Sequence, residues 1–166
     1  MDLSSLGGLL ALTHALAGVT FIAGLIGRWI VLGLAERATD LTSMRTLSAG
    51  AAPFERLVIV GSLVVLVLGV ATAIARGIPF LGPLQGQRVD WLFVSLVLFL
   101  SVVPLVPLVF LPRGKVFDGA MAEADARGEV TPALRAAWRD PVVRAAHVYE
   151  LGAVTVVLVL MLTKPF

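Results

Sequence analysis

Residues 57–75 read LVIVGSLVVLVLGVATAIA, a continuous apolar run that contains no Asp, Glu, Lys or Arg. Two further runs without these charged residues occupy residues 3–27 and 91–112. A helix needs about 20 apolar residues to cross a bilayer core of roughly 30 Å, and each run approaches or exceeds that length. The runs are continuous rather than alternating, which argues against the strands of a membrane barrel. The sequence therefore predicts transmembrane helices.

A fourth apolar run, residues 151–163, is too short to cross a membrane by itself. It must recruit residues back to about Ala145, which brings His147 and Glu150 into the span. We predict an all-α fold, an antiparallel four-helix transmembrane bundle that forms a single membrane domain over residues 1–166. The predicted spans cover about residues 5–34, 54–76, 91–112 and 141–163, with a cytoplasmic loop over residues 113–140.

The composition agrees with a membrane protein and excludes several functional classes. Hydrophobic residues make up 58% of the chain and charged residues 14%, against about 45–50% and about 25% in soluble domains. Four spans use nearly the whole length and leave no room for a soluble catalytic module. There is no cysteine, which excludes disulfides, thiolate metal sites and cysteine nucleophiles. No basic block suited to nucleic acid is present, so the expected partner is the lipid bilayer.

The basic residues predict the orientation of the chain in the membrane. The loop between the first two spans carries three arginines with its flanks, and the loop before the last span carries five arginines and a lysine. The opposite side has only Arg76, Arg88 and Lys164. Because basic loops stay in the cytoplasm, we expect both termini outside. We expect no cleavable signal peptide, since Asp2 is the only charge before the first apolar run.

Proline and glycine mark the expected ends of the helices. Glu36–Ala52 is expected to be a polar loop, and Pro53 the first turn of the second helix. Pro104 and Pro107 are expected to kink the third helix, which should end at Pro112–Gly114. In the loop that follows, we expect two short helices, of which the amphipathic segment 131–139 rests on the membrane surface.

His14 and Arg28 lie on the same face of the first predicted helix, since fourteen residues make nearly four whole turns. Gly18 sits one turn after His14 and would let a neighbouring helix or a flat ligand approach closely. One interpretation is that His14 is a metal or haem ligand beside this glycine slot. The other, which we favour on residue type alone, is a histidine that hydrogen-bonds to another helix.

The fourth predicted helix carries Arg144, His147 and Glu150 at spacings that place them on one stripe. A carboxylate at this depth must pair with a cation or remain protonated, and Arg28 is the expected partner. The functional interpretation is a proton path, or a cofactor site whose propionates meet an arginine. The structural interpretation, slightly favoured, is a buried ion pair that fixes how the first and fourth helices pack.

Three segments resemble a bacterial family of predicted four-helix integral membrane proteins of unknown function: LTHALAGVTFIAGLIGRW (12–29), DWLFVSLVLF (90–99) and VLVLMLTKPF (157–166). The resemblance implies a multi-pass protein of the bacterial cytoplasmic (inner) membrane. More distantly, His14 followed by Gly24 and Arg28 resembles the histidine-bearing helix of haem-containing membrane protoporphyrinogen oxidases and copper-resistance D-type proteins. That second resemblance implies His14 as a ligand of haem b.

These observations leave three functional classes open. The first is a small haem-b-binding electron-transfer or haem-handling protein, in which His14 or His147, or both, ligate the iron, and in which a single site at His14 would lie over Gly18. Counting residues from the helix ends gives the two rings a difference in depth of about 8 Å. The second class is an accessory or assembly membrane subunit without a cofactor, which would pair with another membrane protein or a second copy. The third is a small proton-linked transporter with Glu150 as the proton site.

Overall fold

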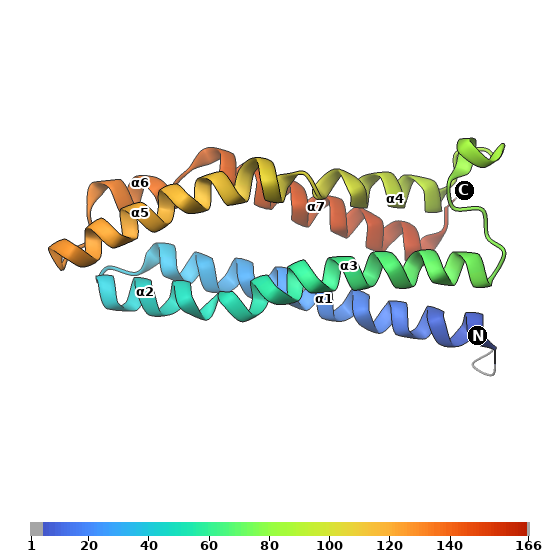
Figure 1. Cartoon of the computed structure of the whole chain (residues 1–166), viewed down its shortest axis with the longest axis horizontal. Coiled ribbons are helices and arrows are strands. Elements are labelled where there is room, and N and C mark those ends of the chain that lie inside the picture. The colour runs from blue at the N-terminus through green and yellow to red at the C-terminus, as the bar shows by residue number, and fades with distance from the viewer. Residues whose placement is uncertain (1–4, 166) are drawn as a thin grey trace.

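The computed structural model describes residues 5–165, and these residues fold almost entirely into helices (Figure 1). The longer helices are α1 (Leu6–Arg37), α3 (Ala52–Ala75), α4 (Trp91–Val102), α5 (Leu111–Arg127) and α7 (Pro141–Thr163). The shorter ones are α2 (Leu41–Gly50), the 3₁₀ helix η1 (Gly82–Gln85), the π-helical segment η2 (Val106–Phe110) and α6 (Pro132–Trp138).

Four stretches of helix are long and apolar enough to span a membrane, which confirms the predicted all-α four-helix bundle. They are α1, α2 with α3, α4 through η2 to α5, and α6 with α7. Neighbouring spans run antiparallel, α1 packing mainly on α3 and α4 mainly on α7 (Figure 1). The two ends of the chain lie at the same end of the bundle, which we call the terminal end (Figure 1). The opposite end carries α2 and α6, and we call it the loop end (Figure 1).

Side-chain caps explain where several helices begin. Ser5 accepts a hydrogen bond from the backbone N–H of Gly8 and caps the start of α1. Pro53 lies in the first turn of α3, where its missing N–H costs no helical hydrogen bond. Thr131 and Asp140 cap α6 and α7 in the same way, each directly before a proline.

The expected polar loop Glu36–Ala52 is wrong, because most of it forms α2. The carboxylate of Asp40 accepts a hydrogen bond from the N–H of Ser43 at 2.8 Å and starts this helix. The small residues that suggested a loop are all compatible with a capped short helix. A capped helix with tertiary packing overrides the weak propensity of Ser, Thr and Gly.

The third predicted helix does not end at Pro112–Gly114 as expected. The chain leaves regular α-helix after Val102, passes through η2, and continues as α5 to Arg127. Pro112 falls in the first turn of α5, where proline is tolerated, and Gly114 is an interior helical residue. Pro104 and Pro107 do interrupt the regular α-helix, as expected. The interruption consists of a turn followed by a π-helical segment.

Two clusters of buried apolar side chains hold the bundle together. In the first, Phe21, Leu25, Val58 and Val154 join α1, α3 and α7, and Phe99 of α4 packs against them. Many other large apolar side chains of the spans are exposed, among them Leu16, Val19, Ile59, Leu63, Val67, Leu108 and Leu162. An apolar exterior of this extent suits a lipid environment.

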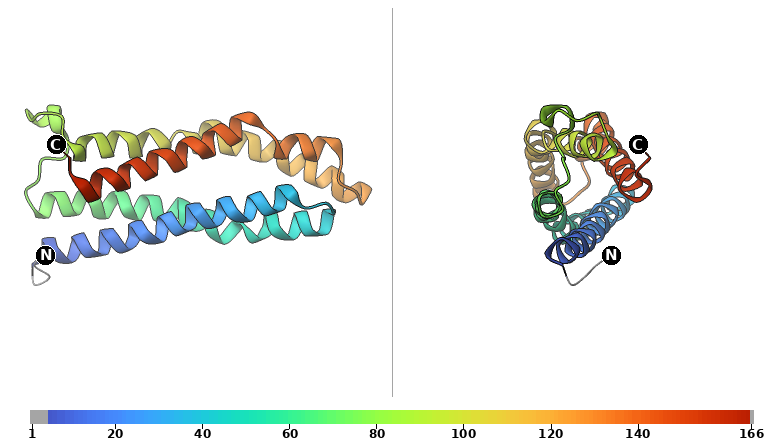
Figure 2. Two further views of the ribbon diagram at one scale, coloured as in Figure 1. Left: turned by 180° about the vertical axis from the view of Figure 1, so that it is seen from behind. Right: turned by 90° about the vertical axis from the view of Figure 1, so that its right-hand side faces the viewer.

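The second cluster lies at the loop end, where Met44, Ala120, Ala124 and Leu134 of α2, α5 and α6 are buried together. Leu134, the apolar centre of the segment 131–139, is therefore covered by protein, and the expectation that this face rests on the membrane surface is wrong. Seen along the bundle axis, α7 lies beside both α4 and α1 (Figure 2). Residues of α7 and α1 can thus build a site between them.

Candidate functional site

Arg28 of α1 and Glu150 of α7 form an ion pair between the guanidinium Nη2 and the carboxylate Oε2. The Glu150 residue is 3% exposed and the Arg28 side chain 11% exposed. Both residues lie well inside their spans, with apolar sequence on either side. The structure thus brings these two predicted residues together, and the pairing offsets the cost of removing each charge from water.

His147 lies one turn before Glu150 on α7, and its ring stacks on Phe110 of η2, with ring centroids 4.8 Å apart and planes inclined by 24°. The Arg28 guanidinium carbon lies 5.6 Å from the centroid of the same Phe110 ring. Phe110 therefore contacts two members of the polar cluster Arg28, His147 and Glu150. Nothing in the sequence pattern singled out Phe110 itself. The available signal was the pair of prolines before it, because a disturbed helix can contain a π-helical segment, and such segments often occur at functional sites.

A second layer of charged groups lies nearer the loop end. The guanidinium of Arg144 on α7 pairs with the carboxylate of Glu36 on α1, with 3.3 Å between Nη2 and Oε1. The backbone carbonyl of Glu36 also accepts a hydrogen bond from Arg135 of α6. The side chain of Arg37 has no partner among residues 5–165. Within the same range, the buried indole Nε1 of Trp138 also lacks a hydrogen-bond acceptor.

These two layers line one open groove between α1, α6 and α7, with a volume of about 520 Å³. The groove residues from α1 are Leu25, Arg28, Trp29, Ile30, Leu32, Gly33, Leu34, Glu36 and Arg37. The remainder are Trp138 of α6 and Val143, Arg144, His147, Val148, Glu150 and Leu151 of α7. The volume is within the range of ligand pockets, about 300–1,000 Å³. Ten of the sixteen lining residues are apolar or glycine, and the other six are ionisable.

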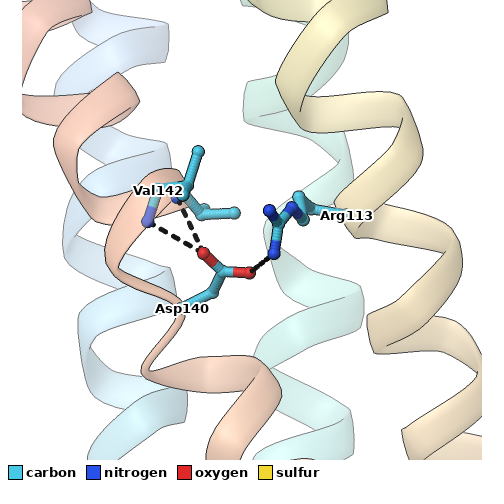
Figure 3. Close-up of polar contacts among 4 residues, drawn as sticks. Arg113, Asp140 and Val142 are labelled. Carbon is cyan, nitrogen blue, oxygen red and sulfur yellow. Dashed lines mark hydrogen bonds and ion pairs between the residues drawn. The ribbon is translucent and has the colours of Figure 1, made fainter.

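Asp140 fixes the start of α7 and hence the position of His147 and Glu150 along the groove. One carboxylate oxygen accepts hydrogen bonds from the N–H groups of Val142 and Val143, at 2.8 and 3.3 Å. The other pairs with Arg113 of α5 at 2.7 Å (Figure 3). The contact ties the loop end of the third span to the first turn of the fourth.

His14 lies elsewhere, in the interface between α1 and α3. Its Nδ1 is 3.0 Å from the carbonyl oxygen of Val65, which can only accept, so Nδ1 carries the proton and donates. The ring also fills the space beside Gly69, where an added Cβ would meet it at 2.9 Å. His14 therefore hydrogen-bonds to another helix, which is the interpretation that we favoured from residue type alone. Above Gly18, by contrast, no atom lies within 4 Å of the position that a Cβ would take.

The structure does not bring His14 and His147 together. Arg28 lies fourteen residues, about 21 Å, along α1 from His14 and is level with Glu150. His147 precedes Glu150 by three residues on the antiparallel α7, which adds about 4.5 Å. A separation of about 25 Å along the bundle axis is far more than the ligands of one iron allow, so the bis-histidine hypothesis is wrong. The estimate of about 8 Å failed because the 32-residue α1 is longer than the bilayer core that it was assumed to match.

Among the described residues, no group of three or more His, Cys, Asp or Glu side chains is arranged to hold a metal ion. Iron held by a porphyrin and one imidazole does not need such a group. His147 is the histidine that lines the groove, and His14 does not line it.

Comparison with known proteins places the chain in a family. The family described as "Predicted integral membrane protein (DUF2269)" matches residues 8–165, nearly the whole chain. No curated protein matches it. No solved structure matches it either. The match covers all four spans and the groove, so the chain belongs to the DUF2269 family of predicted integral membrane proteins.

Proposed function

We propose that this protein handles haem b, which it holds in the groove between α1 and α7 with His147 as the single axial ligand. The observation that carries the proposal is the convergence of His147, three arginines and apolar walls on one groove inside the membrane-spanning part of the chain. A neutral imidazole is a common iron ligand, and arginine pairs well with carboxylates such as the haem propionates.

The apolar residues of the groove suit the macrocycle of haem b, and its arginines suit the propionates. Apolar side chains, among them Ile30, Leu34, Val148 and Leu151, would contact the macrocycle. Arg37 and Arg144 lie toward the loop end and would meet the propionates. Phe110 holds the His147 ring from one face and limits its rotation, which favours a fixed ligand geometry.

An absorption spectrum of the detergent-purified protein, produced with ample haem supply, tests the proposal. Wild-type protein should show a Soret band, and His147→Ala should remove it. His14→Ala is the matched control, since it removes a histidine from the same bundle but outside the groove, and should keep the band. A colourless wild-type protein, or a band that depends on His14 and not on His147, contradicts the proposal.

A second function is favoured by a different observation. The pair Arg28–Glu150 is a polar link between α1 and α7, which otherwise touch at few positions. This supports an accessory or assembly subunit without a cofactor, in which the pair clamps the two helix pairs together. In that case His147→Ala and Phe110→Ala would change neither ligand content nor spectrum, while replacement of Arg28 or Glu150 alone would destabilise the bundle.

A further inference from the structure

We propose that the α3–α4 loop, residues 76–90, inserts its apolar part into the surface of the membrane at the terminal end, where phospholipids of that leaflet cover it. The loop contains η1 and joins the end of the second span, Ala75, to the start of the third, Trp91, so it begins and ends at a membrane boundary (Figure 1). None of its residues lines the groove, so the proposal does not depend on a ligand there.

The first observation is that the loop is apolar although it is not part of a spanning helix. Residues 77–87 contain no Asp, Glu, Lys or Arg, and Arg76 and Arg88 flank them. Leu84 of η1 is 80% exposed, more than any other large apolar side chain that the structure describes. An exposed apolar segment of this kind marks a contact surface.

The second observation concerns the backbone of the same segment. Residues 77–87 include two prolines, which leaves nine backbone N–H groups. At least six of these nine donate hydrogen bonds to oxygens of α3 or of the loop itself. The six belong to Gly77, Ile78, Leu81, Leu84, Gly86 and Gln87. A segment that exchanges water for lipid needs its backbone groups satisfied internally, because lipid tails offer no hydrogen bonds. This loop already meets most of that requirement.

The third observation is that the protein holds the loop in a defined position. Gly82 has φ +50°, and an added Cβ there would lie 2.9 Å from the ring of Phe93 in the first turn of α4. The side-chain oxygen of Gln85 accepts a hydrogen bond from the N–H of Leu81 at 2.9 Å. As a result, η1 lies at the outer edge of the bundle, beside the start of α4 (Figures 1 and 2). A structured turn therefore presents Leu84 outward.

The fourth observation identifies the occupant as lipid. Trp91 follows the loop directly, and the Lys164 ammonium lies 5.5 Å from the centroid of its ring. Tryptophan and lysine at the ends of spans are typical of the level of the lipid head groups. The exposed apolar face of α4, which includes Val97 and Leu100, continues from this level into the membrane. The loop extends that lipid-facing surface at its edge, where irregular backbone is tolerated.

The test is electron paramagnetic resonance of a nitroxide spin label on Leu84→Cys, in the full-length chain, which has no other cysteine. The protein is placed at one copy per phospholipid nanodisc. Relaxation of the label is measured with oxygen, which concentrates in lipid, and with a nickel chelate, which stays in water. Leu63→Cys, exposed in the middle of α3, is the matched control for lipid, and Glu129→Cys, exposed after the end of α5, is the control for water.

We expect the ratio of the oxygen effect to the chelate effect to exceed one at positions 63 and 84 and to fall below one at position 129. A ratio at position 84 that matches position 129 would place the loop in water and overturn the proposal. A label at position 84 that neither reagent reaches would mean that protein covers the loop, which also overturns it. Haem enters none of these measurements, so the outcome is separate from that of the haem proposal.

Discussion

At the scale of single residues, the Arg28–Glu150 pair places two charged side chains inside the bundle. Each charge is nearly removed from solvent, and each is tolerated because the other is present. A buried pair of this kind contributes little net stability compared with apolar residues of similar volume. Its effect is specificity, because it sets one register between α1 and α7, and with it the position of His147.

The pair should show strong coupling in a double-mutant cycle. Arg28→Met or Glu150→Leu alone leaves an uncompensated buried charge and should reduce the free energy of unfolding by about 3–5 kcal/mol. The double variant should lose much less than the sum of the two. Unfolding of the four proteins in detergent, followed by circular dichroism, measures the coupling. Additive losses would mean that the two side chains act independently and would argue against the clamp.

At the scale of helices, Gly24 is one of the glycines on which the close approach of α1 and α3 depends. An added Cβ at Gly24 would lie 2.9 Å from the Cβ of Leu57 and 3.4 Å from two backbone atoms of α3. Backbone cannot move aside as a side chain can, so Gly24→Ala should separate the helices and cost about 1–3 kcal/mol. Gly18→Ala, on the same helix but with open space, should be neutral or stabilising by up to about 1 kcal/mol. Melting temperatures in detergent compare the two, and equal effects would contradict the packing.

The α2 helix should depend on pH through its cap. The backbone N–H of Ser43 donates to Asp40 and holds the pKa of that carboxyl below its usual range. Because the pKa of Asp40 is lowered in the folded state, its ionised carboxylate stabilises the fold at pH values above the usual aspartate pKa of about 3.9. This contribution is lost as the pH falls through the lower pKa of the folded state. Hydrogen exchange should therefore show α2 amides losing protection at acid pH. Asp40→Asn caps without titrating, so its α2 should lack this pH dependence; if wild type and variant respond alike, the cap is not the cause.

The four spans and the Arg28–Glu150 pair could be predicted from local patterns in the sequence, whereas the groove could not. Long apolar runs, caps and prolines predicted the four spans and several helix starts, and the need to neutralise Glu150 pointed to Arg28. The sequence failed where tertiary packing decides the outcome. The α2 helix is stabilised by burial of Met44. Phe110 reaches the polar cluster only because the chain changes helical register at η2, a shift that no periodicity in the sequence encodes.

At the scale of the whole molecule, two helix pairs meet at a polar cluster, and the groove that this cluster lines also includes Glu36, Arg37 and Trp138 of the loop end. The distribution of arginine and lysine predicts that the loop end faces the cytoplasm and that both termini face outside. With that orientation, haem b would enter the groove from the inner leaflet. The chain has no cysteine, so a single engineered thiol reports on one position without background.

The most direct test of the account uses Val143→Cys, at a groove-lining position in the first turn of α7. The measurement is its reaction with a water-soluble maleimide in sealed membrane vesicles. We predict labelling when the reagent is on the cytoplasmic side, no labelling from the outside, and strong slowing when haem b is added. Gly119→Cys, on α5 outside the groove with open space around it, should label from the same side at a rate that haem does not change. A thiol at position 143 that labels from the outside, or at an unchanged rate with saturating haem, would contradict the account.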